Sequence, residues 1–544
     1  MKNNKIKKYL KLLSYIGPYK KQRIFIVLIC TLSIITSSFL PYLIGNFISK
    51  VQMSVELKQI ISYGLIIFCV GAFSSVLESY QNYKWHSFRI EVINYFRTLM
   101  MKVSFNKEMS YFRNKNEDFG SRILEDSVIV AQSISIGVAM LYLNILRIVV
   151  VFALMLRINI KLSIIILCFV PIYTLYYHYV DKRVAENSRK ERSSYSQLSN
   201  NIKNILKGIL HIKIYNKEEY FYDGFNDKVR EYSKFSKNLK LYDSIGYGVG
   251  QFIKTILPVT ILIVGAIEVY NGRMSLGYLF TFYAYLEYLY EPMMNLSDWY
   301  SGTQVTLGMS DRVVNYLECN DEISGDITID EIDDIRFEDV SFGFETETKI
   351  LNNFNLHIQK GDILGVVGKS GSGKSTLINL ILKIWKNYDG DILINGVNLK
   401  SIDTDSLYKC VSYVEQENFI FNGTLRENIA FEDDKDNEIN NCISLARIDD
   451  QSIKRDDFVI LDDGYNLSSG QKQRISIARC FYKNSSLIIL DEFTSNIDKE
   501  IENEILNNLM SMNLENKIVI IVSHRENPLK LCNKILNLNE KKSI

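Results

Sequence analysis

Long apolar runs alternate with long polar stretches through the first half of the chain. Residues 24–49 and 59–77 contain no charged side chain, and the same holds for 127–146 and 162–180. Each run is long enough, or nearly so, to cross a bilayer as a helix. Two weaker apolar runs have charged flanks, and we count them as membrane helices rather than as buried core helices. The expected spans are residues 24–49, 59–77, 127–156, 162–180, 250–270 and 274–291.

Two polar stretches, about Glu78–Asp126 and Asp181–Lys240, separate some of these runs. Both combine mixed charge with recurring apolar positions. Since irregular loops of this length are uncommon, we expect the membrane helices to continue through them into the cytoplasm. Lys and Arg are concentrated in residues 2–23, which places the N-terminus in the cytoplasm. Six spans then return the chain to the cytoplasm.

The second half of the chain has a different pattern. Strand-like runs alternate with helical runs there, as in an α/β nucleotide-binding fold. Residues 320–334 are rich in Asp and Glu and are expected to form a linker. The predicted fold is therefore a six-helix transmembrane domain, residues 1–319, followed by an α/β P-loop ATPase domain, residues 335–544.

A glycine-rich loop gives this second domain its chemistry. Residues 368–376 read Gly-Lys-Ser-Gly-Ser-Gly-Lys-Ser-Thr, between an apolar strand pattern and an apolar helical run. In such a loop the backbone N–H groups and the helix N-terminus bind phosphate, the lysine reaches the β- and γ-phosphates, and the serine hydroxyl holds Mg²⁺. The residues expected to bind ATP are Gly368, Lys369, Ser370, Gly371, Ser372, Gly373, Lys374, Ser375 and Thr376.

A second pattern supplies the groups that hydrolysis needs. The buried-strand sequence 487–490 ends in two acids, Asp491 and Glu492. Asp491 can hold Mg²⁺ through water, and Glu492 can activate the attacking water. Apolar strands that end in acids are common, so the assignment depends on the phosphate loop upstream.

Residues 467–471, Leu-Ser-Ser-Gly-Gln, resemble the LSGGQ signature of ABC ATPases and lie 20 residues before the strand that begins at Leu487. Other motifs of that family follow in the expected order, including a D-loop at residues 495–498. The resemblance implies that ATP is contacted by Ser468, Ser469, Gly470 and Gln471, that Phe344 stacks on adenine, that Gln416 contacts Mg²⁺, and that His524 is the switch histidine. It thus implies four catalytic residues, Lys374, Gln416, Glu492 and His524.

The amino-terminal half resembles the membrane domain of type IV exporters of the same family. Tyr111-Phe112 is similar to the first coupling region, and residues 206–209 are similar to the second intracellular stretch. The resemblance implies a half-transporter in the cell membrane. In this family ATP is bound between the phosphate loop of one ATPase domain and the signature of another, so a second half-transporter, identical or different, is implied as partner.

Three positions depart from the family pattern. Ser469 occupies a position where glycine is usual, and its Cβ could crowd backbone that approaches the γ-phosphate. Phe344 replaces tyrosine but keeps the stacking surface, and Asn496 replaces a small residue of the D-loop. None of these changes removes a catalytic group, and we expect a working ATPase with ATP and Mg²⁺ as its cofactors.

The leading function is ATP-driven export of a peptide, a lipid or a small amphipathic compound by alternating access. The alternatives are a type IV-fold importer of a metal-chelating compound and an ATP-gated regulatory membrane protein. The net charge of +1 argues against a nucleic-acid partner. Eight scattered cysteines without a C-x-x-C pair argue against a disulfide framework or zinc site. The composition suggests a bacterial source.

Charges inside the membrane domain form a further candidate site. Arg147 interrupts the third expected span, and Glu287 lies in the sixth at a similar depth, with Glu291 one helical turn away. Intramembrane charges normally face a bundle interior or a watery cavity. Two hypotheses follow: an acidic patch that selects cationic substrates, or a static Arg147–Glu287 ion pair.

Overall fold

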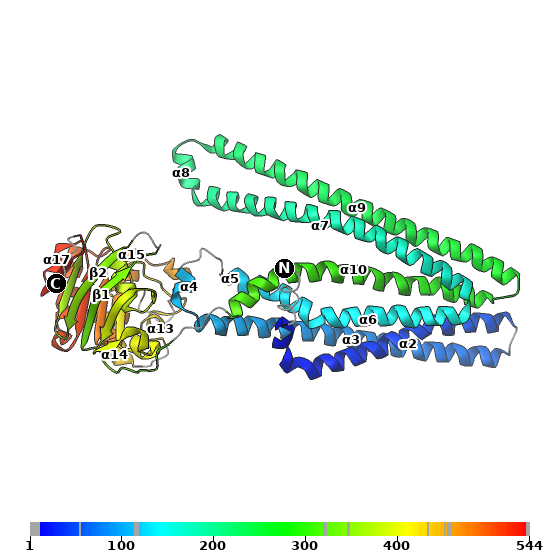
Figure 1. Cartoon of the computed structure of the whole chain (residues 1–544), viewed down its shortest axis with the longest axis horizontal. Coiled ribbons are helices and arrows are strands. Elements are labelled where there is room, and N and C mark those ends of the chain that lie inside the picture. Colours follow the sequence, from blue (N-terminus) through cyan, green and yellow to red (C-terminus); the bar gives the residue numbers. More distant parts are fainter. Residues whose placement is uncertain are drawn as a thin grey trace. The chain divides into compact units, whose positions relative to one another are not determined.

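The structure is a computed structural model that describes residues 11–53, 56–113, 119–318, 324–344, 349–431, 435–450, 453 and 458–539. It contains two compact units, each of which is described by itself (Figure 1). The membrane unit comprises Met1–Phe105 and Glu117–Cys319. The ATPase unit comprises Asn106–Asn116 and Asn320–Ile544. The two units meet in the sequence after Cys319, and an internal segment of the expected membrane domain, Asn106–Asn116, belongs to the ATPase unit.

Long helices build the membrane unit, as the apolar runs predict. They continue well into both polar stretches: α3 ends only at Phe105, α7 ends at Lys207 and α9 begins at Glu218. The long helices are α2 (Lys20–Gln52), α3 (Leu57–Phe105), α6 (Ser127–Ile158), α7 (Ile160–Lys207), α9 (Glu218–Tyr270) and α10 (Leu276–Glu318). The short helices α5 (Phe119–Ser121) and α8 (Ile209–Ile214) lie between them.

Four of the described helices are long and apolar enough to cross a membrane. They are Gly17–Gln52, Leu57–Phe105, Arg122–Ile158 and Glu218–Tyr270. Many of their large apolar side chains, such as Leu28, Phe68 and Val76, are exposed, which suits a surface in contact with lipid. The spans predicted in α7 and α10 stay predictions. In the described part of α7 the apolar helical stretch is Ile160–Phe169.

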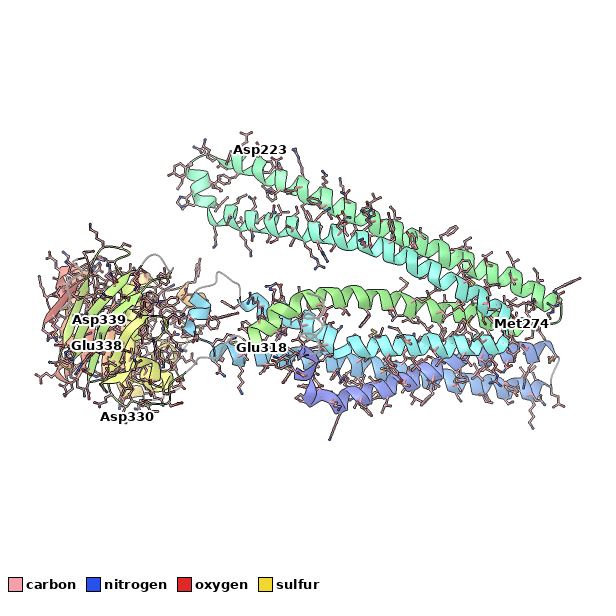
Figure 2. All side chains as sticks on the ribbon, in the orientation of Figure 1. Asp223, Met274, Glu318, Asp330, Glu338 and Asp339 are labelled. Carbon is pink, nitrogen blue, oxygen red and sulfur yellow. The ribbon has the colours of Figure 1, made fainter. Side chains whose placement is uncertain are left out.

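A buried apolar cluster joins four helices at one end of the membrane unit. We call it the Met274 cluster, after the residue that Figure 2 labels at that end, opposite Asp223. The cluster includes Val151, Met155, Leu162, Ile166, Leu257, Ile261, Met274, Leu279 and Phe282. From this end α7 and α9 run together as a hairpin, away from α6 and α10, to α8 at the hairpin tip (Figure 1).

Glu268 fixes α9 to the start of α7 at the same end of the unit. Its buried carboxylate accepts a hydrogen bond from Lys161 Nζ at 3.1 Å and lies 3.6 Å from Arg273 Nη1. Two cations on one buried carboxylate compensate for the loss of its hydration.

Two sheets form the frame of the ATPase unit, as the alternating pattern predicts. A five-stranded parallel sheet has the order β6-β7-β8-β3-β9, and a four-stranded antiparallel sheet has the order β2-β1-β4-β5. The strands are β1 (Asp334–Phe342), β2 (Leu351–Gln359), β3 (Ile363–Val367), β4 (Asp389–Ile394), β5 (Val397–Asn398), β6 (Val411–Val414), β7 (Leu487–Asp491), β8 (Ile518–Val522) and β9 (Lys534–Asn537).

Helices cover these sheets and complete the core. Strands β7 and β8 are buried along their whole length, which is typical of a parallel sheet covered on both faces. The helices are α11 (Lys374–Ile381), α12 (Thr404–Lys409), α13 (Leu425–Ala430), α14 (Asp436–Leu445), α15 (Ser469–Lys483), α16 (Lys499–Met510) and α17 (Glu526–Leu529).

Residues 324–333, which the sequence predicts as linker, are instead part of the ATPase unit. The Gly325 N–H donates to Ile402 O, the Ser324 hydroxyl donates to Asp403, and Ile332 is fully buried. Helix α4 (Met109–Arg113) also belongs to this unit, where Glu108 lies 3.4 Å from Lys386 Nζ. Apolar residues among the acidic ones of residues 324–333 explain why this segment packs against the ATPase unit instead of forming a linker.

Candidate functional site

The predicted catalytic residues come together at the carboxyl edge of the five-stranded sheet. Because β3, β6, β7 and β8 are parallel neighbours in one sheet, their carboxyl ends lie at the same edge. The phosphate loop follows β3, and Glu492 follows β7. Gln416 follows β6, and His524 follows β8. Ligands of open α/β sheets bind at this edge.

The phosphate loop has the backbone that its glycines predict. Gly371 and Gly373 have φ values of +80° and +102°, a region that glycine adopts without strain. Gly373 caps α11, so the positive end of that helix dipole points into the loop. Lys374 Nζ donates to Gly368 O at 2.7 Å and to Lys369 O at 3.2 Å, which holds the ammonium over the loop.

Asp491 and Glu492 have different surroundings although they are adjacent. Asp491 is buried at the end of β7, and burial together with the neighbouring Glu492 charge raises the pKa of its carboxyl to about 6, while Lys374 opposes this effect. Glu492 is partly exposed and has a φ of +48°, in the left-handed region that non-glycine residues rarely adopt. The turn after β7 therefore presents Glu492 at the sheet edge while Asp491 stays inside.

Two of the predicted residues meet on the Glu492 carboxylate. Gln416 Nε2 donates to Glu492 Oε2 at 3.0 Å, and His524 Nε2 lies 3.6 Å from Glu492 Oε1. The carboxylate is thus oriented by groups from the ends of β6 and β8. A carboxylate held in this way beside a phosphate loop can activate water for attack on a phosphoryl group.

Phe344 presents an aromatic surface, as the adenine assignment requires. Its side chain is 61% exposed, and its ring contacts Phe342 and Trp385 edge-on at 5.4 Å between centroids in both cases. These edge contacts leave the ring face available for stacking. Sequence reasoning did not identify Trp385 as the support of this ring.

The signature forms the N-terminus of α15. The Ser468 hydroxyl accepts from the Gln471 N–H at 3.2 Å, and Gln471 Oε1 accepts from the Ser468 N–H at 2.7 Å, which is a complete capping box. Ser469 is exposed, and it is Gly470 that is tightly packed, because a Cβ there would lie 2.8 Å from Asn496 O. Among the described residues no hydrogen bond or ion pair joins the signature to the phosphate loop of the same chain.

The donor set fits ATP with Mg²⁺. The Ser372 hydroxyl in the phosphate loop is buried and has no hydrogen-bond partner among the described residues. The part of the chain that the structure describes has no group of three or more His, Cys, Asp or Glu side chains arranged to hold a metal. Mg²⁺ usually binds through one or two carboxylates together with substrate phosphates rather than in such a cage. Ser375, Gln416 and Asp491 suit that mode.

The intramembrane charges are arranged differently from the predicted static pair. Arg147 Nη1 donates to Glu291 Oε2 at 2.8 Å, with side chains that are 22% and 65% exposed. Glu287 is exposed and has no ion pair in the described part of the unit. The hypothesis of a static Arg147–Glu287 pair is therefore wrong, because helical spacing gives the depth of a residue but not the face of α10 that meets α6. The hypothesis of an acidic patch that selects cationic substrates stays a prediction.

Two residues that contact the loop after β7 were missed as site residues. Gln473 is fully buried in α15 and hydrogen-bonds to Glu492 O, and Arg525 Nη2 donates to Ser495 O at 2.8 Å. The sequence does contain a signal for the first residue. Gln473 lies four residues before Ile477 on the buried face of α15, so an amide occupies an apolar position.

Comparison with known families gives two adjacent matches. The ABC transporter transmembrane region matches residues 24–293, and the ABC transporter ATPase family matches residues 351–495. The two matches follow one another in the order that the structure shows, with helices first and the α/β unit second.

Full-length relatives and a solved structure extend these matches. The chain is 29% identical, over 96% of its length and 74% of the relative, to a lactococcin-G-processing and transport ATP-binding protein of Lactococcus lactis. It is 27% identical, over 92% of its length and 89% of the relative, to an ATP-dependent lipid A-core flippase of Desulfotalea psychrophila. The fold matches a bacterial Atm1-family ABC exporter with a TM-score of 0.81 and 18% identity, over 96% and 94% of the two chains.

Proposed function

Because the chain belongs to the ABC transporter superfamily and is an ATPase that drives transport across a membrane, we propose that two half-transporters assemble to export a peptide or amphipathic compound from the cytoplasm. The observation that carries the proposal is the meeting of Gln416, Glu492 and His524 beside the phosphate loop, in a chain with apolar membrane-length helices. A protein that only senses ATP does not need an oriented base.

The residues divide the work of hydrolysis as follows. Backbone N–H groups of the phosphate loop and Lys374 bind the phosphates, while Phe344 stacks on adenine. Ser375 and Asp491, with Gln416 nearby, would hold Mg²⁺, which would supply positive charge against the negative charge that develops on the phosphates. Glu492 accepts a proton from the attacking water, and His524 orients that carboxylate.

Two copies of the chain are needed in this proposal because, among the described residues, no hydrogen bond or ion pair joins the signature and the phosphate loop of one chain. The N-terminus of α15 has the Ser468–Gln471 capping box and a positive dipole end, which suits a phosphate supplied by a second chain. Closure of two ATPase units on ATP would then bias the membrane helices between two arrangements.

Exposed apolar side chains at α8 support a docking site on the second copy. Leu206, Leu210, Ile214 and Tyr215 are all largely exposed at the tip of the α7–α9 hairpin, where an apolar hollow of about 500 Å³ opens. An apolar tip of this kind normally contacts another surface. The ATPase unit has a hollow of about 440 Å³ lined by Met109 of α4 and by Leu382, Tyr408, Tyr413, Arg479 and Lys483. We propose that α8 of one copy occupies this hollow of the other.

Hydrolysis is tested with two variants of the reconstituted full chain. Glu492→Gln should lower the ATPase rate at least about 100-fold while leaving ATP binding near that of the parent, because the phosphate loop is intact. Lys374→Ala should instead weaken ATP binding. Stimulation of the parent by a panel of peptides, lipids and cationic drugs then identifies the substrate class. Turnover by Glu492→Gln near the parent rate would contradict the assignment.

The two-copy site is tested by mixing two inactive variants. Lys374→Ala inactivates the phosphate loop, and Ser469→Asp places a carboxylate at the exposed signature position that faces phosphate in the proposed dimer. In a mixed dimer one composite site carries both changes and the other carries neither. Random co-assembly should therefore restore about a quarter of the parent rate. No recovery in a verified mixed dimer would show that each site is built by one chain.

A further inference from the structure

The backbone of Glu492 needs support because it has an unfavourable conformation. Its φ of +48° lies in the left-handed region, which costs a non-glycine residue on the order of 1–3 kcal/mol and persists only where surrounding contacts fix it. Its N–H donates to Val522 O at 2.9 Å, and its carbonyl accepts from the Ser495 N–H at 3.0 Å. The first bond is made with strand β8, and the second is made within the turn itself.

Gln473 adds contacts from outside that turn. Its Nε2 donates to Glu492 O at 2.9 Å and to Ser495 Oγ at 3.2 Å, and its Oε1 accepts from the Asn496 N–H at 2.9 Å. One side-chain amide thus hydrogen-bonds to three residues of the turn after β7, Glu492, Ser495 and Asn496. The residue is 0% exposed, so water does not compete for these bonds.

The position of Gln473 relates these contacts to the signature. It lies five residues after Ser468, the N-cap of α15, in the same continuous helix. A shift of α15 is therefore transmitted to Glu492 O through a direct hydrogen bond. Gln473 does not contact the carboxylate itself, which is held by Gln416 and His524.

We propose that Gln473 is the positioning residue for the base Glu492, and that it links the base of one ATP site to the signature helix that serves the other. The proposal rests on the proposed function of Glu492 and of the two-copy site. Gln473 fixes the backbone of Glu492 so that the carboxylate stays within reach of water, and it lets movement of α15 alter that reach.

The proposal is tested in the reconstituted full chain with Gln473→Met, which keeps the side-chain volume but removes all three hydrogen bonds. A misplacement of about 1 Å in a catalytic group can lower turnover about 100-fold. We therefore expect kcat to fall by that order while KM for ATP stays within about two-fold, because the phosphate loop is unchanged. Gln473→Asn keeps an amide one methylene shorter and should give a smaller loss, about 10-fold.

Asn428→Leu is the matched control. Asn428 is also a buried amide, with side-chain bonds to Phe421, Thr424 and Arg479, but among the described residues it has no hydrogen bond to the loop after β7. The Tm of the Asn428→Leu protein measures the stability that is lost with a buried amide. The kcat of this protein should stay near that of the parent. The proposal is overturned if kcat falls no more in the Gln473 variants than in this control. It is also overturned if the Gln473 variants show a higher KM for ATP together with a larger fall in Tm than the control, because Gln473 then has only a structural role.

A double variant separates this proposal from the assignment of the base. Residues that act as one unit have non-additive effects on turnover. Gln473→Met in a Glu492→Gln chain should therefore lower the residual rate no more than about two-fold. If the two changes reduce the ATPase rate by the product of their separate effects, Gln473 does not act by positioning Glu492. If Glu492→Gln alone retains the parent rate, the proposed function fails instead, whatever the Gln473 variants do.

Discussion

Asp491 shows how a functional residue lowers the stability of the site that contains it. Its ordinary pKa is 3.8, and burial next to Glu492 raises the pKa in the folded protein to about 6. Between these values the folded protein binds more protons at this residue than the unfolded chain does. The free energy of unfolding therefore falls as pH rises through this window and stays reduced at neutral pH.

Asp491→Asn should raise stability while removing activity. The uncharged amide avoids the unfavourable charge at pH 7.5, so the Tm of the ATPase unit without nucleotide should rise by about 2 °C or more. The increase should shrink as pH falls from about 6 to about 4, because the parent carboxyl becomes neutral there. Mg²⁺-dependent ATP hydrolysis should be lost. Thermal scans at several pH values check this, and a lower Tm at pH 7.5 would contradict the role given to burial.

The signature offers a pair of adjacent positions with opposite expectations. Ser469 is exposed, so Ser469→Gly should raise the ATPase rate or leave it within about two-fold. Gly470→Ala places a Cβ 2.8 Å from Asn496 O, so the D-loop must shift and the rate should fall about 10-fold or more. Steady-state ATPase assays decide the comparison. A large loss in Ser469→Gly would show that the serine hydroxyl is required.

Residues with a local sequence pattern could be placed without a structure. Lys374 and Glu492 are positioned by a strand, a turn and a helix that the apolar pattern predicts, and the parallel sheet then brings their ends to one edge. The helical pattern indicates that Gln473 is buried, but its contacts could not be predicted in this way. Two of its three partners are backbone atoms of the loop after β7, Glu492 O and the Asn496 N–H, and no residue type in that loop indicates them.

At the scale of elements, the ion pair between α6 and α10 allows a test of helix packing. Arg147 and Glu291 are both partly exposed, so we expect a coupling energy of about 1 kcal/mol or less. Arg147→Gln and Glu291→Gln should each lower the Tm of the reconstituted chain, and the double variant should lose less than the sum of the two. Additive losses would contradict a stabilising pair.

Glu287→Gln is the matched control, since Glu287 lies one turn from Glu291 on α10. It should leave the Tm unchanged, because no ion pair involves it among the described residues. ATPase stimulation by cationic and neutral compounds, measured in the same proteins, tests the separate hypothesis of cation selection. That hypothesis predicts a shift in stimulation for Glu287→Gln without a change in Tm, and unchanged stimulation would argue against it.

The extents of the long helices could be predicted from apolar and polar patterning, whereas their pairing could not. The pattern predicts that α3 and α9 run far beyond the apolar segments, and they do. It does not reveal that the segment around α4 leaves the membrane unit, because its contacts depend on the surface of the ATPase unit. Similarly, the choice of Glu291 over Glu287 depends on the rotation of α10 about its own axis.

At the scale of the whole molecule, the proposed docking of α8 allows a test of communication between two copies. Tyr215 is the C-cap of α8 and is 70% exposed, whereas Tyr270, the last residue of α9, is 91% exposed. Tyr215→Asp places a charge on the apolar tip, and it should abolish stimulation of the ATPase by substrate while retaining some basal activity. Tyr270→Asp makes the same change away from α8 and should retain stimulation. Equal effects of both changes would argue against docking through α8.

The α7–α9 hairpin extends from the Met274 cluster, so a tilt of its helices at the cluster is amplified along their length. A helix of 48 residues such as α7 is about 72 Å long at 1.5 Å per residue, so a tilt of about 5° at the cluster moves the far end by about 6 Å. The Glu268 contacts with Lys161 and Arg273 hold the two arms together where such a tilt begins. A small change in packing at the Met274 cluster therefore corresponds to a large displacement of α8. A displacement of α8 by about the 5.4 Å rise of one helical turn requires atoms near the cluster to move by less than the diameter of an atom.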